Sequence, residues 1–250
     1  MQLYTKKRFS YLPEIFNCYK YYDKVISVSN QTNEENKNNL ARDYQIPLEK
    51  FDFVDNAINY QEVLDKSKES LPTYIENKYF QTNSITFINI ARLSIEKDQE
   101  KLIRAFKEIH SKYPNTKLLI LGDGPLKEHL QELIIDLRLK KSVFLLGRIS
   151  NPFPYLKKSN CFIMSSNHEG QGLAMMEALI LRKTIISTNF SCAYDVLDNG
   201  RYGKIIENNK QALVAAMEVF INQDLKFESF DYENYNNKTM RDFYHKICNH

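Results

Sequence analysis

Short apolar runs alternate with amphipathic stretches of helix length from residue 84 onward. The runs cover residues 85–91, 117–121, 143–146, 161–164 and 184–187. They are continuously apolar rather than alternating, which is typical of strands that are covered on both faces of a sheet. Strands that alternate with helices along the chain predict a parallel, doubly wound sheet. We therefore expect a Rossmann-like α/β domain over residues 84–225.

The stretches between the runs carry their apolar residues on one helical face. Leu102, Ile103, Phe106 and Ile109 recur at helical spacing, and leucines and an isoleucine do the same over residues 126–137. Because each such stretch lies between two strands, the helices are expected to cover the sheet.

The flanking parts of the chain are less regular. Residues 61–83 are polar and contain Pro72, so we expect a linker with some helix there. In residues 226–250 we expect a loop and then a final helix from about residue 235 to residue 247. In the first part of the chain, the pattern predicts helices at residues 13–22 and 32–44 and short strands at residues 25–29 and 51–54.

The composition is that of a folded globular protein. Of 250 residues, 43% are hydrophobic and 26% are charged, and the net charge is +3. A nucleic-acid-binding domain would show strong basic clustering, so we expect no nucleic-acid partner. No apolar run reaches the roughly 18 residues of a membrane span, and no secretory signal is evident. The four scattered cysteines indicate reduced thiols, and we expect a cytoplasmic protein.

Candidate chemistry lies directly after the apolar runs, where a doubly wound sheet binds its ligands. Arg92 and Lys97 follow the first run, and the turn at residues 122–125 follows the second. Arg148-Ile149 follows the third run, and the segment at residues 165–173 follows the fourth and leads into a helix. These segments are expected to meet at one edge of the sheet.

The segment after the fourth run predicts an anion site. Gly170 and Gly172 let a ligand approach the backbone closely, and the following helix presents free N–H groups and a partial positive charge. Arg92 and Lys97 would add two full charges, which suits a diphosphate.

Two carboxylates flank this anion site along the chain. Glu169 precedes the helix and Glu177 lies within it. A carboxylate accepts hydrogen bonds from paired hydroxyls such as those of a sugar or a ribose. Both side chains are therefore candidates for contacts with a sugar-bearing ligand.

Taken together, these segments resemble the retaining GT-B glycosyltransferases of family GT4. The resemblance rests on Arg92 with Lys97, on Gly122-Asp123-Gly124-Pro125, and on residues 169–179, in which Glu169 and Glu177 match the family's E-x7-E motif. It extends more weakly over residues 23–244.

The resemblance implies a role for each matching residue. Arg92 and Lys97 would hold the diphosphate of a nucleotide-sugar and, with Glu169, act in catalysis. Glu169 would contact the transferred sugar and Glu177 the ribose, while Arg148 and Ile149 would lie against the base. Transfer with retention and without a metal or other cofactor is implied. The expected substrate-binding set is Arg92, Lys97, Gly122, Arg148, Ile149, Glu169, Gly170, Gln171, Gly172, Leu173 and Glu177.

Three positions depart from the family pattern. Ala91 stands where the family usually has glycine, and Arg182-Lys183 replaces a Gly-x-Pro turn, which puts the geometry of that turn in question. Gln171 replaces the commoner phenylalanine. The resulting sequence Glu-Gly-Gln-Gly (EGQG) resembles that of bacterial enzymes that glycosylate wall teichoic acids or related surface polymers.

Length is the largest departure, since the family has two Rossmann-like domains. Residues 1–60 resemble only the end of the first domain, residues 61–83 a linker, and residues 226–250 the crossover helix. The missing N-terminal half would carry most of the acceptor site. We expect a transferase that moves a hexosyl or N-acetylhexosaminyl group from a UDP-sugar to a glycan, teichoic-acid-like or lipid-linked acceptor.

Other interpretations remain open. The chain can be a nucleotide-sugar-binding module that does not turn over, or a nucleotide-sugar epimerase of related architecture. Basic and aromatic residues at positions 6–22 would suit peripheral contact with the inner face of a membrane. Two residues also have a purely structural interpretation. Arg92 can form a surface salt bridge with Glu96, and His168 can be an ordinary residue of a surface loop.

Overall fold

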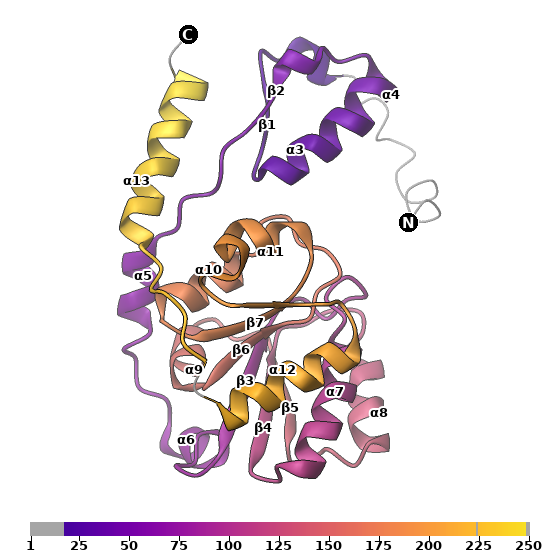
Figure 1. The fold of residues 1–250 in the computed structure, drawn as a ribbon, viewed down its shortest axis with the longest axis vertical. Helices are drawn as coiled ribbons and strands as arrows, with labels where there is room; N and C mark the ends of the chain where they lie inside the picture. The colour runs from indigo at the N-terminus through magenta and orange to yellow at the C-terminus, as the bar shows by residue number, and fades with distance from the viewer. Residues whose placement is uncertain (1–17, 224, 249–250) are drawn as a thin grey trace. The chain divides into compact units, whose positions relative to one another are not determined.

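The computed structural model describes residues 18–223 and 225–248, so half of the predicted helix at residues 13–22 and most of the basic, aromatic segment lie outside the described residues. In the described half of that prediction, Cys18–Tyr21 form a 3-10 helix. The chain forms two compact units. The larger comprises Asn59–Tyr232, and the smaller is formed by the described residues before and after it. Figure 1 shows the sheet of the larger unit with helices on both faces.

The larger unit holds a parallel sheet of six strands in the order β5-β4-β3-β6-β7-β8. Numbered within this sheet, the order is 3-2-1-4-5-6, the doubly wound arrangement, so the predicted fold class is confirmed. The bounds are β3 Ile85–Ile90, β4 Thr116–Leu121, β5 Val143–Gly147, β6 Cys161–Met164, β7 Thr184–Thr188 and β8 Lys204–Ile206. The strand β8 was not predicted, because three residues are too few to form an apolar run.

Helices cover both faces of this sheet (Figure 1). On one face α12 (Lys210–Asn222) packs on α7 (Gln99–Lys112), which packs on α8 (Lys127–Asp136). On the other, α10 (Leu173–Ile180) and α9 (Phe153–Lys158) both contact α5 (Tyr60–Lys66).

Aromatic rings join the first of these faces to the sheet. Phe87 of β3 packs edge-to-face on Phe106 of α7 and on Phe220 of α12, with ring centroids 6.4 and 5.7 Å apart. Phe87 and Phe106 are fully buried. The two helices are thereby anchored on the strand that leads into the candidate site.

The segment predicted as a linker, residues 61–83, forms two helices in the larger unit, α5 and α6 (Thr73–Tyr79). Asn151 Nδ2 donates to the carbonyl of Lys66 at 3.0 Å, and Lys117 Nζ donates to the carbonyl of Lys78 at 2.6 Å. The Tyr60 ring packs on that of Tyr232, with centroids 4.8 Å apart. These contacts tie the segment to the domain, although its polar sequence gave no sign of them.

Two helices end in the same turn with an arginine in the left-handed region. After α8, Arg138 has φ 58°, and after α10, Arg182 has φ 54°. In the second turn Arg182 N donates to Leu179 O and Lys183 N donates to Ala178 O, both at 2.9 Å. This is the bonding pattern of a Schellman motif, which usually has glycine at this position. The turn that departs from the family pattern therefore closes without glycine.

The smaller unit pairs β1 (Val25–Ser27) in parallel with β2 (Phe51–Phe53). Between them lie α3 (Asn30–Asn36), capped by the Ser29 hydroxyl, a π-helical turn (Lys37–Ala41), α4 (Arg42–Tyr44) and a 3-10 turn (Leu48–Lys50). The helix α13 (Tyr232–Phe243) continues into a π-helical turn (Tyr244–Cys248).

One side-chain amide and one lysine tie α13 and the turn after it to the strand region of the smaller unit. Asn236 accepts from the backbone N–H of Ile58 at 3.0 Å and donates to the same residue's carbonyl at 2.5 Å. Lys246 Nζ lies 3.0 Å from Asp52 Oδ1. The final helix, predicted at about residues 235–247, is confirmed with an earlier start.

Candidate functional site

The candidate site lies where the strand order reverses, between β3 and β6. These strands pair only through Phe87 with Cys161 and Ile88 with Phe162. Beyond these pairs, Asn89 Nδ2 donates to the carbonyl of Ile163 at 2.8 Å. The loops that follow the two strands therefore begin side by side, at the crevice where doubly wound sheets bind ligands.

Hydrogen bonds join these two loops directly. The backbone N–H of Asn167 donates to the Glu96 carbonyl at 2.7 Å, and Ser165 Oγ donates to the Lys97 carbonyl at 2.9 Å. Asn167 Nδ2 reaches the Ile95 carbonyl at 3.3 Å. The loops that carry the predicted cations and carboxylate are thus held to one another.

Lys97 and Glu169, which the sequence analysis placed in one site, form an ion pair. Lys97 Nζ lies 2.5 Å from Glu169 Oε2, and the side chains are 21% and 12% exposed. Lys97 Nζ also donates to the His168 carbonyl at 3.4 Å. Mutual neutralisation offsets the cost of removing both charges from water.

Arg92 lies on the same loop, and its guanidinium is exposed. Gln99 Nε2 donates to the Arg92 carbonyl at 2.9 Å, which fixes the backbone at this position. Arg92 forms no ion pair with any described residue, so the salt bridge considered with Glu96 is absent among residues 18–223 and 225–248. The pKa of Glu96 is lowered mainly by the hydrogen bond from Ser94, and the charge of Arg92 contributes least to this lowering.

Gly172 caps α10 in a left-handed conformation, with φ +73°. A Cβ at this position would lie 2.7 Å from Cε of Met175, whereas a Cβ on Gly170 would meet no atom within 4 Å. Gly172 offers no side chain to cap the helix, no cap from another described side chain is present, and Leu173 is 48% exposed. The first N–H groups of α10 therefore lack a side-chain acceptor. Gln171, between the two glycines, is buried.

Glu177 lies further along α10 and is half-buried. Burial raises the pKa of this carboxyl to about 7. In the part of the chain that the structure describes, no side chain donates a hydrogen bond to it, and it does not contact Glu169. An uncompensated buried carboxylate is costly, which favours a role toward a ligand over a role in packing.

The glycines of the turn at residues 122–125 shape the loop that carries Arg92. A Cβ on Gly122 would lie 1.9 Å from the Ala91 carbonyl oxygen, and one on Gly124 would lie 2.3 Å from that of Leu93. Leu93 N also donates to the Asp123 carbonyl at 3.1 Å. Gly122, a predicted ligand contact, thus has a structural reason for being glycine.

Arg148 and Ile149 follow β5 at the same edge of the sheet. Arg148 is exposed and Ile149 is half-buried. The carbonyl of Gly147 accepts from Gly122 N at 2.8 Å, so this loop is attached to the turn after β4. No described contact joins Arg148 or Ile149 to the Lys97–Glu169 pair.

Several residues at the site gave no signal of their own in the sequence. Asn167 bonds to the loop after β3, and Ser166 donates to Glu169 at 2.7 Å. Cys192, 1% exposed, would lie 3.7 Å from a Cβ on Gly172. Burial, with a smaller effect of the Glu169 charge, raises the pKa of its thiol to about 12. Ser166 and Asn167 could have been found from their position in the segment after the fourth apolar run. No feature of the sequence pointed to Cys192.

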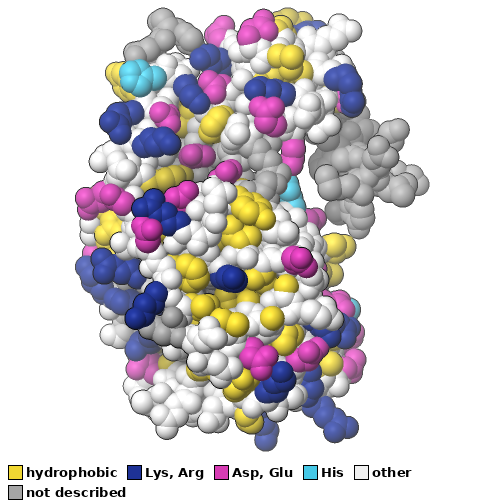
Figure 2. Space-filling model, in the orientation of Figure 1, with side chains coloured by type: hydrophobic (Ala, Val, Ile, Leu, Met, Phe, Trp, Pro, Cys, Tyr) yellow, Lys and Arg dark blue, Asp and Glu magenta, His cyan; other side chains and the backbone are white. Residues whose placement is uncertain are grey.

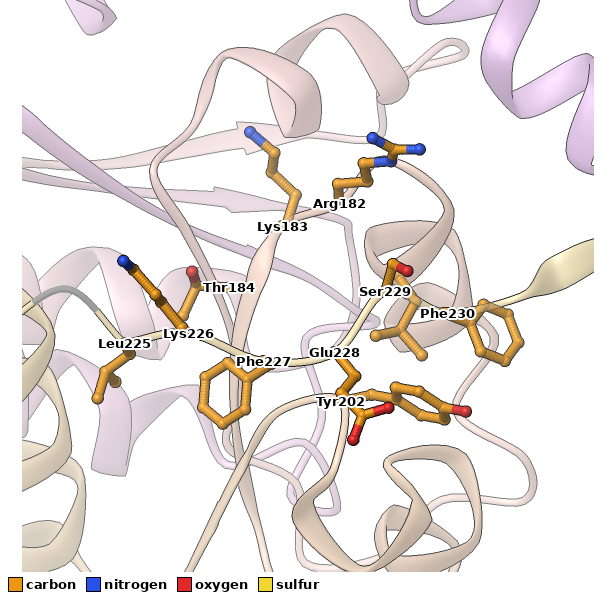
Figure 3. Close-up of a pocket in the computed structure, with 11 residues that line it drawn as sticks. Arg182, Lys183, Thr184, Tyr202, Leu225, Lys226, Phe227, Glu228, Ser229 and Phe230 are labelled. Carbon is orange, nitrogen blue, oxygen red and sulfur yellow. The ribbon is translucent and has the colours of Figure 1, made fainter.

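A separate pocket lies at the opposite edge of the sheet, at the start of β7 (Figure 3). Arg182, Lys183 and the segment Leu225–Phe230 line it. Lys183 Nζ donates to the carbonyls of Lys157 and Ser159 at 2.7 and 2.9 Å, and burial lowers the pKa of its ammonium. This pocket contains none of the predicted site residues.

On the face drawn in Figure 2, acidic and basic side chains are interspersed.

Comparison with known proteins identifies the family of this chain. Residues 72–237 match the family described as glycosyl transferases group 1. The chain belongs to this family. The resemblance inferred from Arg92, Lys97 and residues 169–179 is thereby confirmed.

Two curated relatives match much of the chain. An uncharacterized glycosyltransferase of Methanocaldococcus jannaschii is 42% identical over 70% of this chain and 43% of its own length. An N-acetylgalactosamine-N,N'-diacetylbacillosaminyl-diphospho-undecaprenol 4-alpha-N-acetylgalactosaminyltransferase of Campylobacter jejuni is 26% identical over 89% of this chain and 58% of its own length. The chain spans about half the length of these relatives.

A solved structure shares the fold. Anabaena Alr3699/HepE, crystallised in complex with UDP and glucose, superimposes with a TM-score of 0.73 at 17% identity, over 93% of this chain and 66% of the other. The structural neighbours are GT-B glycosyltransferases, in agreement with the predicted fold class. Within the described residues, no helix combines the length and the apolar character needed to cross a bilayer.

Proposed function

We propose that this chain supplies the donor site of a retaining glycosyltransferase that uses a nucleotide-sugar, with UDP as the nucleotide. The observation that carries the proposal is the Lys97–Glu169 ion pair between the loops that follow β3 and β6. It places a cation and a carboxylate beside a helix start without a side-chain cap, at the ligand-binding edge of a doubly wound sheet.

Each group has a chemical role in this proposal. Arg92 and Lys97 bind the diphosphate, and the N–H groups of Gly172 and Leu173 donate to its oxygens. Negative charge grows on the diphosphate as the glycosidic bond breaks, so these donors stabilise the transition state. Ribose hydroxyls donate to Glu177. Arg148 and Ile149 lie against the base.

Glu169 accepts hydrogen bonds from the transferred hexose or N-acetylhexosamine. The side chain is only 12% exposed, so water competes little for its oxygens. Transfer with retention and without a metal is part of the proposal, since the cations and the helix start supply the positive charge that a metal would otherwise supply.

The proposed acceptor is a cell-surface polymer or a lipid-linked glycan precursor at the cytoplasmic face of the membrane. The Campylobacter relative, named for transfer to a diphospho-undecaprenol-linked sugar, supports this class. A teichoic-acid-like acceptor, suggested by the EGQG sequence at Glu169–Gly172, stays a prediction. Contact with a membrane surface is a further part of the proposal.

Calorimetry tests the donor site. UDP, UDP-glucose, UDP-N-acetylglucosamine and UDP-N-acetylgalactosamine are titrated into the full chain, and at least one sugar nucleotide is expected to bind more tightly than UDP. Lys97→Ala should weaken the binding of UDP at least tenfold, because a hydrogen bond to a charged group contributes roughly 1.5–3 kcal/mol. Lys112→Ala, at the far end of α7, is the control and should leave binding unchanged. No binding at millimolar nucleotide would refute the proposal.

A donor-binding module without turnover is the second candidate. It is favoured by one observation, that the chain spans about half the length of its curated relatives. Release of free sugar from a bound UDP-sugar, followed by chromatography, separates the two. Binding without any hydrolysis or transfer would assign the chain as a module.

A further inference from the structure

A buried hydroxyl lies beneath the carboxylate of Glu169. Ser166 is fully buried, and its Oγ donates to Glu169 Oε1 at 2.7 Å. The thioether of Met164 lies 3.2 Å from the same hydroxyl, but a carboxylate oxygen is closer and is the far stronger acceptor. Since Lys97 Nζ binds Oε2, each oxygen of Glu169 has its own donor.

The end of a neighbouring strand holds Ser166 in place. Thr188, the last residue of β7, is fully buried, and its Oγ1 donates to the Ser166 carbonyl at 2.6 Å. A hydrogen-bonded chain therefore runs from β7 through Ser166 to the carboxylate. Glu169 itself follows in a loop outside any helix or strand, so this chain fixes its side chain to the rigid sheet.

We propose that Ser166 is a positioning residue that acts through Glu169 on the sugar of the donor; this rests on the proposed function. With one donor on each oxygen, the plane of the carboxylate is fixed. Each oxygen keeps a second lone pair for a sugar hydroxyl. Without the hydroxyl of Ser166, Oε1 loses its protein donor and the carboxylate can turn about its bond to the side chain.

The proposal predicts a selective effect. The diphosphate and ribose contacts come from other residues, so Ser166→Ala should change the Kd for UDP less than about twofold. The preference for the best-bound UDP-sugar over UDP should fall about tenfold, a typical result of losing a partner of a ligand-binding side chain. Ser142→Ala removes another buried hydroxyl, which donates to the Leu139 carbonyl at the start of β5, and should leave both affinities unchanged.

A double-mutant cycle shows whether Ser166 acts through Glu169. In a Glu169→Gln background, Ser166→Ala should have little further effect on the preference for the sugar nucleotide. Circular dichroism shows whether the alanine variant folds. If it does not, Ser166→Cys replaces it in the experiment, since a thiol fills the same space but is a weaker hydrogen-bond donor.

Each outcome is decisive. Equal losses for UDP and UDP-sugar, or additive effects in the cycle, would overturn the positioning role. A wild-type preference that Ser166→Ala leaves intact would overturn it while leaving the proposed function standing. A wild-type chain that does not prefer any tested UDP-sugar to UDP would instead overturn the role of Glu169, and with it this inference.

Discussion

Glu177→Gln is expected to make the protein more stable and its nucleotide binding weaker. Burial raises the pKa of Glu177 to about 7 from an ordinary value of 4.5, with no donor from the described residues to offset it. A buried neutral amide costs less than a buried anion. The same carboxylate is the proposed acceptor for the ribose hydroxyls.

The magnitude follows from the pKa shift. The folded state holds the Glu177 proton more tightly than the unfolded state does, so stability falls as the pH rises from 4.5 to 7. At 1.36 kcal/mol per pH unit, the difference between a pKa of 4.5 and one of about 7 corresponds to roughly 3 kcal/mol at pH 8. At pH 5 less than about 1 kcal/mol of this cost is present. The gain from Glu177→Gln should therefore grow by about 2.5 kcal/mol between pH 5 and pH 8.

Urea unfolding at the two pH values measures this difference. Glu132→Gln, which removes an exposed glutamate of α8, is the matched control and should show no such trend. Calorimetry at pH 8 should show UDP binding at least about tenfold weaker in Glu177→Gln, because a neutral oxygen replaces a charged acceptor. A stability difference that does not depend on pH would refute the desolvation of Glu177, and unchanged UDP affinity would refute its ribose role.

Three further predictions follow from the geometry. UDP affinity of the wild type should fall about fivefold between pH 7 and pH 6, because ribose binding requires the ionised Glu177; a flat profile over this interval would contradict this. Arg182→Gly and Arg138→Gly should each raise the free energy of unfolding by about 0.5–1 kcal/mol, since glycine removes the left-handed strain; a loss of stability in urea would argue against it. Gly122→Ala should cost more than about 3 kcal/mol or prevent folding, while Gly170→Ala should leave the melting temperature within 2 °C or so.

The strands that build the site could be predicted from the sequence because they are continuous apolar runs. Residues 161–164 coincide with β6, and the predicted start and end of β4 each lie within a residue of the observed ones. The strand β8 was missed because Lys204–Ile206 offers only two apolar residues. The helices of residues 60–79 were underestimated, since their packing depends on partners such as Asn151 and Lys117, which are distant in the sequence.

Part of the site, like part of the fold, could be predicted from the sequence. That Arg92, Lys97 and Glu169 lie at one edge of the sheet follows from where the strands end, so it could be predicted. The pairing of Lys97 with Glu169 and the support from Ser166 could not, because they depend on side-chain conformations and on the spacing of two loops. Gly122 illustrates a motif residue whose identity is explained by a backbone carbonyl 1.9 Å from the position of a Cβ.

The ion pair at the centre of the site governs how its mutants must be interpreted. Lys97 and Glu169 are each mostly removed from water, and each offsets the desolvation of the other. Replacing Glu169 alone leaves Lys97 without its partner, so a lower affinity for a UDP-sugar would combine a lost sugar contact with an altered diphosphate contact. UDP, which lacks the sugar, reports only the second effect. The ratio of the two affinities therefore isolates the sugar contact, and Ser166→Ala, which removes no charge, is the cleaner probe of the carboxylate's orientation.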